Sequence, residues 1–142
     1  MEWLKELVEY GMIGILVLMS IAAVAITTER YMILKKINLQ DFTDKKSLEL
    51  ELTKKLHFLA TIGSNAPYIG LLGTVLGIML TFYTMGKDGI MDSNKIMVGL
   101  ALAMKVTAVG LGVAIPTVVF YNLLLRKVKE MIMQWEINNK GN

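Results

Sequence analysis

Three long apolar stretches, separated by charged segments, dominate the pattern of the chain. Residues 11–28 and 59–85 contain no charged side chain, and residues 96–125 contain one, Lys105. A helix rises 1.5 Å per residue, so even the shortest stretch covers about 27 Å, close to the hydrocarbon thickness of a bilayer. The pattern predicts an all-α membrane protein with three transmembrane helices in one domain, residues 1–142.

The segments between these stretches differ in positive charge. Residues 29–58 carry seven lysines and arginines and residues 126–142 carry four, whereas residues 1–10 and 86–95 together carry three. Positive charge is retained on the cytoplasmic side, so we expect the amino terminus and the loop 86–95 outside and the tail 126–142 in the cytoplasm. The acidic start, with three glutamates against Lys5, is unlike a signal peptide, so the first span is expected to be retained.

The cytoplasmic segments are expected to be helical. Four leucines recur at helical spacing without a glycine or proline between them, which predicts one long helix continuing into the second span: Leu48, Leu52, Leu56 and Leu59. The tail repeats the pattern at Val128, Met131, Ile132 and Trp135. It could lie on the membrane surface or extend the bundle below the membrane, and we favour the extended bundle.

Small residues form stripes along the second and third spans. The second span carries Gly63, Gly70, Gly73 and Gly77, and the third carries Gly99, Ala103, Thr107, Gly110 and Ala114. Glycine gains nothing from contact with lipid but lets two helix backbones approach closely. Three spans cannot easily enclose so many small faces, so we expect these spans to pack together and to line the lumen of a homo-oligomer.

Threonines are the polar points on these stripes. Thr74 and Thr107 lie on them, and Thr81 follows Thr74 by seven residues. A threonine hydroxyl can bond back to a carbonyl of its own helix, which is a structural role, or it can belong to a polar ring that lines a proton path. No carboxylate lies inside a predicted span, so an acid that carries protons is expected to come from another chain.

Lys105 and two prolines interrupt the apolar pattern. Lys105 lies two residues from Thr107, or about 200° round a helix, so it points away from the threonine stripe. We expect a structural charge that pairs across a subunit interface or extends to the membrane surface; a direct transport role is the alternative. Pro67 and Pro116 are expected to kink the second and third spans.

Composition excludes several other classes of protein. The chain has no cysteine and a single histidine, His57, which excludes a disulfide scaffold, thiolate metal sites and a multi-histidine metal site. The spans offer no cluster of nucleophiles or metal ligands, so we expect neither an enzyme nor a cofactor. The cations flank apolar segments, which is typical of contact with membrane lipids and not of nucleic-acid binding.

Two motifs resemble those of a known family. Residues 66–79, APYIGLLGTVLGIM, resemble the second-span motif of the MotA/TolQ/ExbB proton-channel family. Residues 106–111, VTAVGL, followed by Ala114-Ile115-Pro116, resemble its third-span motif, and Glu29-Arg30 also fits. The resemblance places Thr74 and Thr107 on the family's two lumen-facing threonines. Leu102 stands where some members have a glutamate, and residues 29–58 are too few for the torque domain of a flagellar stator.

Within the family the chain is most similar to a short ExbB. That resemblance implies a pentamer in the bacterial inner membrane, with a periplasmic amino terminus, around the helices of an ExbD dimer whose aspartate supplies the missing acid. It implies that the proton motive force then acts through TonB on outer-membrane import, for example of iron complexes. A TolQ-like subunit of the Tol-Pal envelope system and a passive membrane scaffold without ion movement are the alternatives.

Overall fold

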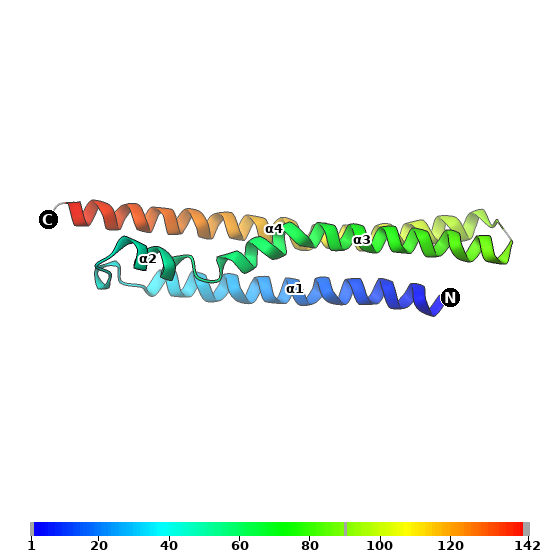
Figure 1. Ribbon diagram of the computed structural model, residues 1–142, viewed down its shortest axis with the longest axis horizontal. Helices are drawn as coiled ribbons and strands as arrows, with labels where there is room; N and C mark the ends of the chain where they lie inside the picture. The colour runs from blue at the N-terminus through cyan, green and yellow to red at the C-terminus, as the bar shows by residue number, and fades with distance from the viewer. Residues whose placement is uncertain (1, 90, 141–142) are drawn as a thin grey trace.

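The computed structural model describes residues 2–89 and 91–140, so part of the predicted loop 86–95 and of the tail 126–142 lies outside the described residues. In chain order the elements are α1 (Glu2–Lys36), the short 3-10 helix η1 (Leu39–Asp41), α2 (Lys45–Leu52), α3 (Leu56–Asp88) and α4 (Ser93–Lys140). Figure 1 shows α1, α3 and α4 running along one axis. The amino terminus lies near the α3–α4 connection, at what we call the loop end, and α4 finishes at the opposite tail end.

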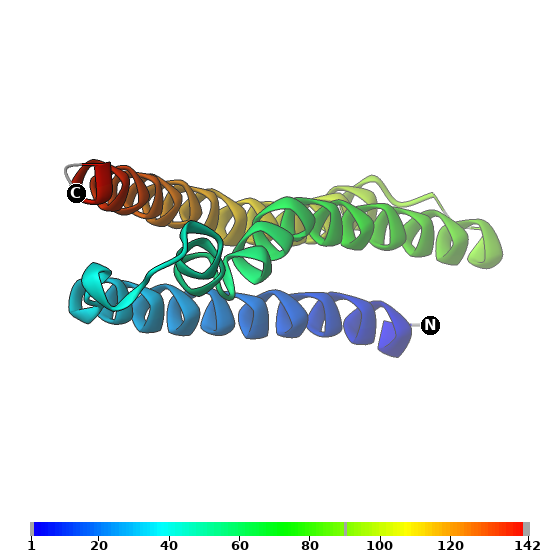
Figure 2. The same ribbon diagram turned by 60° about the vertical axis from the view of Figure 1, so that its left-hand side comes forward.

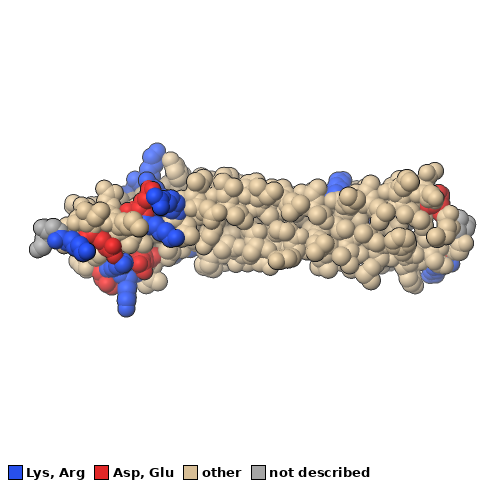
Figure 3. Space-filling model, turned by 90° about the horizontal axis from the view of Figure 1, so that it is seen from above, with Lys and Arg blue, Asp and Glu red and all other residues tan. Residues whose placement is uncertain are grey.

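The three predicted spans lie in α1, α3 and α4. Each of these helices is long and apolar enough to cross a membrane, and only 11% to 22% of each apolar stretch is buried within the chain. Figure 3 shows charged side chains gathered mainly at the tail end, beside a long surface with few charges. An all-α architecture with three helices able to span a membrane is therefore confirmed, and most of their apolar surface is left for lipid or other chains.

Helices α3 and α4 pack along each other over most of the membrane-spanning region (Figures 1 and 2). Both continue as helix through their prolines, Pro67 in α3 and Pro116 in α4. Gly89 ends α3 with φ +70°, and its N–H donates to the Met85 carbonyl. That left-handed conformation favours glycine, and it allows the chain to reverse into α4.

The expectation of one unbroken helix from Leu48 into the second span is wrong. Helix α2 ends at Leu52, and α3 begins at Leu56 after Lys55, whose φ is +68°. All four leucines of the predicted face are nevertheless buried in one apolar cluster. The break lets α2 pack on its neighbours, which a straight continuation of α3 would prevent.

Arg30 supplies the physical reason for this break. A helix that ends leaves its last carbonyls without partners. The Arg30 guanidinium donates to the carbonyls of Glu51, at 2.6 Å, and of Leu52, at 3.3 Å. The Thr53 hydroxyl donates to the Glu49 carbonyl at 2.6 Å. A cation from α1, 1% exposed, thus replaces the hydrogen bonds that a continuous helix would have made.

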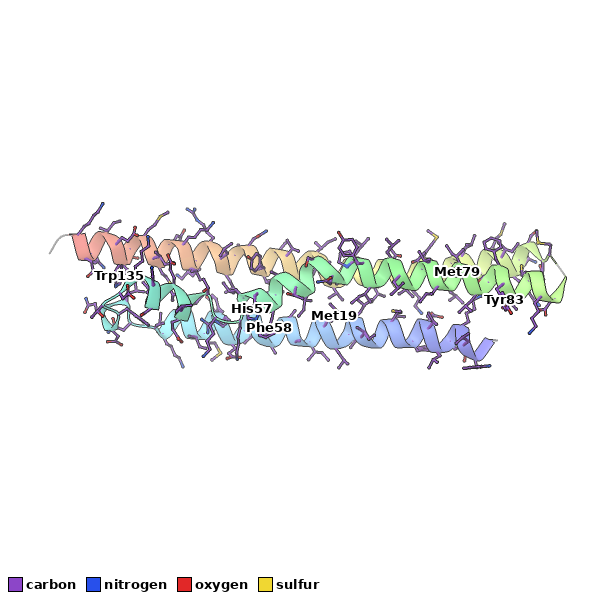
Figure 4. The ribbon with its side chains drawn as sticks, viewed as in Figure 1. Met19, His57, Phe58, Met79, Tyr83 and Trp135 are labelled. Atoms are coloured by element: carbon purple, nitrogen blue, oxygen red, sulfur yellow. The ribbon has the colours of Figure 1, made fainter. Side chains whose placement is uncertain are left out.

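The bundle continues past the third apolar stretch to the tail end. Val128 and Met131 are buried against the segment that joins α1 to α3. The Trp135 indole donates to the Phe42 carbonyl at 3.0 Å, and Figure 4 shows Trp135 on the side of α4 that faces the joining segment. Lys45 forms an ion pair with Glu136. The tail is therefore packed on its own chain, as the extended bundle requires.

Candidate functional site: a threonine pair between α3 and α4

The backbones of α3 and α4 come closest at two glycines. A Cβ added to Gly110 would lie 2.7 Å from the Ala66 carbonyl oxygen and 3.0 Å from the Gly70 Cα. A Cβ added to Gly70 would lie 3.0 Å from the Val106 carbonyl oxygen. These neighbours are backbone atoms that no rotamer change can move, so glycine is needed at both positions. We call this contact the α3–α4 seam.

Other predicted small residues lie along the same seam. A Cβ at Gly77 would meet the Ala103 side chain at 3.0 Å, and a Cβ at Gly63 would meet the Val118 side chain at 2.9 Å. All predicted packing positions except the half-buried Gly77 are buried; in chain order they are Gly63, Gly70, Gly73, Gly77, Gly99, Ala103, Gly110 and Ala114. Gly112, on another face of α4, has nothing within 4 Å of its Cβ position.

Thr74 and Thr107 meet across the seam. Their hydroxyl oxygens are in hydrogen-bonding contact. The Thr74 hydroxyl lies 2.8 Å from the Ala103 carbonyl on the opposite helix, and the Thr107 hydroxyl lies 3.3 Å from the Gly70 carbonyl. A hydroxyl has one proton to donate, so when Thr74 donates to Ala103 its oxygen is free to accept from Thr107. The result is a hydrogen-bond chain from Thr107 through Thr74 to Ala103.

The hydrogen bonds of Thr74 are not confined to its own helix. Thr74 also lies 3.3 Å from the Gly70 carbonyl of its own helix, but the shorter contact crosses to α4. Both threonines are partly buried. Their role in a proton path stays a prediction, and the structure brings together the two side chains that this prediction needs.

Thr81 has a different environment. It is 4% exposed, and its hydroxyl donates to the Gly77 carbonyl of its own helix at 2.8 Å. Across from it, a Cβ at Gly99 would lie 2.6 Å from the Thr81 oxygen. Thr81 is thus enclosed within a single chain, seven residues nearer the loop end than Thr74. Its hydrogen bond to a carbonyl of its own helix is the one expected of a structural threonine.

Lys105 pairs within the chain, whereas the sequence suggested a partner across a subunit interface. Its ammonium nitrogen lies 3.7 Å from a Glu9 carboxylate oxygen of α1. No carboxylate lies inside the three apolar stretches, but α1 begins at Glu2 and brings Glu9, just before the first of them, alongside Lys105 of α4. The expectation that a proton-carrying acid comes from another chain stays a prediction. Lys5 and Glu9 are one helical turn apart and precede the buried Leu16. This spacing is a sequence signal from which the two side chains could have been predicted as site residues.

Burial of Arg30 was also missed. The sequence identified it only as part of the Glu29-Arg30 motif, because its carbonyl partners follow it by more than twenty residues.

Among the described residues, no group of three or more histidine, cysteine, aspartate or glutamate side chains could hold a metal ion.

Comparison with known proteins bears on this site. The family described as the MotA/TolQ/ExbB proton channel family matches residues 25–137, which include both threonines and the seam. Biopolymer transport protein ExbB of Aquifex aeolicus is 54% identical over 136 residues, covering 96% of this chain and 92% of the relative. A putative biopolymer transport protein ExbB-like 2 of Helicobacter pylori is 52% identical over 134 residues, covering 94% and 89%. ExbB of Salmonella typhimurium is 42% identical over 71 residues, covering 50% of this chain and 29% of the relative.

Proposed function

The chain belongs to the MotA/TolQ/ExbB proton channel family and is ExbB-like, and on that premise we propose that it is the proton-channel scaffold of an energy-transducing complex in the bacterial inner membrane. In this complex it works with ExbD and TonB and uses the proton motive force to energise outer-membrane import. It has no enzymatic activity of its own.

The hydrogen-bond chain between Thr107, Thr74 and the Ala103 carbonyl is the observation that carries this proposal. Hydroxyls that both donate and accept can relay a proton to a neighbour that titrates. Neither threonine titrates at physiological pH, so the relay needs a carboxylate within reach. An aspartate on an ExbD helix beside the seam is the proposed source.

Assembly as a pentamer provides the surface where such a partner would bind. Most of each apolar stretch is exposed in a single chain, and the face of α4 that carries Ala101, Ala108 and Gly112 is also exposed. Small exposed residues suit close contact between helices of different chains. The excess of lysine and arginine in residues 29–58 and 126–142 supports a periplasmic amino terminus and a cytoplasmic carboxyl terminus.

Native mass measurement of the complex in lipid, co-expressed with its single-span partner, is the first test. Five copies of 15.8 kDa give about 79 kDa, to which two copies of the partner are added. A monomer or dimer without a partner would remove the shared lumen and leave a passive scaffold. Co-purification with a TolA-type protein in place of TonB would instead identify the TolQ-like alternative.

Valine substitution tests the threonine chain itself. Thr74→Val and Thr107→Val keep the shape of the side chain and remove the hydroxyl, so both are expected to abolish growth on a scarce TonB-dependent iron source. Thr117→Val is the matched control, because the Thr117 hydroxyl is buried in α4 and donates to its own helix at Val113, 2.7 Å away. Wild-type growth of the double Thr74/Thr107 variant would refute a proton path through the seam.

A further inference from the structure

A charged cleft opens at the loop end, outside the threonine seam. It has a volume of about 470 Å³ and lies between the first turns of α1 and the ends of α3 and α4. Its charged lining comes from all three helices and their connection: Lys5, Glu6, Glu9, Asp88, Asp92 and Lys95. A water molecule takes about 30 Å³ of liquid volume, so a cleft of this size has room for several waters beside its charged groups.

Glu9 lines two neighbouring cavities. It lines the open cleft and also a separate cavity of about 10 Å³ whose lining includes Gly73, Gly77 and Val106 on the seam. Gly73 and Val106 are the sequence neighbours of Thr74 and Thr107. Among the carboxylates that line the cleft, Glu9 is therefore the one that also lines the cavity beside the helix contact that carries the threonines.

The surroundings of Glu9 leave its carboxylate available for exchange with water. Its side chain is 15% exposed, and its charged partner Lys105 lies at 3.7 Å with a side chain that is 58% exposed. The separation of 3.7 Å between Lys105 and Glu9 is longer than a hydrogen bond. A charge pair at membrane depth is costly, and such groups commonly belong to ion or proton pathways.

We propose that Glu9 is a proton-carrying carboxylate that this chain itself supplies, reached from the loop end through the hydrated cleft and held in place by Lys105. The proposal rests on the proton-conducting function proposed above. In the step, a hydronium ion in the cleft gives its proton to a Glu9 carboxylate oxygen and becomes water, and the proton later leaves to water on the inner side. Residues 25–137 match the family, so Glu9 lies outside the matched part.

Protonation of Glu9 has a structural consequence. The neutral acid no longer attracts the Lys105 ammonium group, so the contact between α1 and α4 weakens while the proton is bound. Glu9 thereby links proton occupancy to the position of α1. If the ion pair between Glu9 and Lys105 were purely structural, proton binding would not change the position of α1. Two neutral side chains could then replace the pair without loss of proton flux.

Cysteine accessibility tests whether water enters the cleft. The chain has no cysteine, so single replacements can be labelled without background. Leu102→Cys places a thiol in the cleft lining. Leu18→Cys is the control, because Leu18 is exposed on α1 but lies inside the apolar stretch 11–28 and outside the cleft lining, so no water is expected beside it. A membrane-impermeant methanethiosulfonate added on the periplasmic side is expected to label Leu102→Cys and to label Leu18→Cys slowly. No labelling of Leu102→Cys would overturn the hydrated cleft.

Proton flux into liposomes that hold the whole complex tests Glu9 directly. Glu9→Gln is expected to lower the flux at least about tenfold, since positioned acids accelerate proton transfer by about a hundredfold or more, and Glu9→Asp is expected to restore part of it. Glu29→Gln is the matched control, because Glu29 is also on α1 and paired with a lysine, Lys55 at 2.8 Å, but lies at the tail end. It is expected to keep wild-type flux.

The double variant Glu9→Gln with Lys105→Met separates proton carrying from an ion-pair role. It leaves no unpaired charge, so the assembly is retained by native mass, yet the flux is expected to stay low. Wild-type flux in the double variant or in Glu9→Gln would overturn the role of Glu9 while the proposed function stands. Absence of flux in the wild-type complex would instead remove the proposed function and this inference together.

Discussion

Replacing Gly110 with alanine would separate α3 and α4 at the point of their closest approach. The new Cβ would lie 2.7 Å from the Ala66 carbonyl oxygen, whereas ordinary contacts of a Cβ begin at 3.4 Å. The helices must therefore move apart by roughly 0.7 Å, and inserting a methyl group into a packed contact costs about 1–3 kcal/mol. The same movement lengthens the 2.8 Å contact between the Thr74 hydroxyl and the Ala103 carbonyl.

The expected effect can be measured by thermal unfolding of the purified complex, followed by circular dichroism. For a chain of 142 residues, 1 kcal/mol moves Tm by roughly 3–4 °C, so Gly110→Ala is expected to melt roughly 3–12 °C below the wild type. Iron-dependent growth of the variant should also fall, because the threonine chain is disturbed.

Two other glycines provide matched controls for Gly110. Gly11 and Gly14, both on α1, have nothing within 4 Å of their Cβ positions in the chain. Alanine at either position also has the higher helix propensity, by about 1 kcal/mol, so neither variant should melt below the wild type. A Gly110→Ala complex with an unchanged Tm would refute the argument that direct backbone contact fixes the seam.

The hydrogen bonds and ion pair at the tail end give two further predictions. Arg30→Met should lower the free energy of unfolding by about 1–3 kcal/mol, because it leaves buried carbonyls unpaired, and trypsin should then cut faster between α1 and α3. Arg126→Met, at an exposed site, is the control. Equal cleavage rates in the two variants would contradict the role of Arg30. The hydrogen bond and charge of Glu136 raise the pKa of Lys45 above its ordinary value, and those of Lys45 lower the pKa of Glu136. The ion pair therefore stabilises the tail fully at pH values between the ordinary pKa of glutamate and the ordinary pKa of lysine. This stabilisation is lost as the pH falls through the lowered pKa of Glu136, and also as the pH rises through the raised pKa of Lys45. Trp135 fluorescence should shift at both limits, and a flat profile would contradict this.

The apolar stretches predicted the fold well because the signal for a membrane span is local. A stretch of about 20 apolar residues can satisfy its backbone in lipid only as a helix, so composition alone located α1, α3 and α4. The small residues on the second and third spans likewise pointed to close helix contact, because a missing side chain is visible in the sequence. Thr74 and Thr107 could be selected on the same stripes.

Contacts between distant residues could be decided only by the tertiary structure. The helix break at Lys55 depends on the Arg30 guanidinium of α1, which replaces hydrogen bonds at the end of α2. The local sequence pattern from residue 48 to residue 59 gives no indication of this distant partner. Glu9 reaches Lys105 because α1 begins at Glu2 and packs beside α4. Apolar periodicity determines which segments form helices and which faces are buried, whereas the partner of each charge depends on how the helices are packed together.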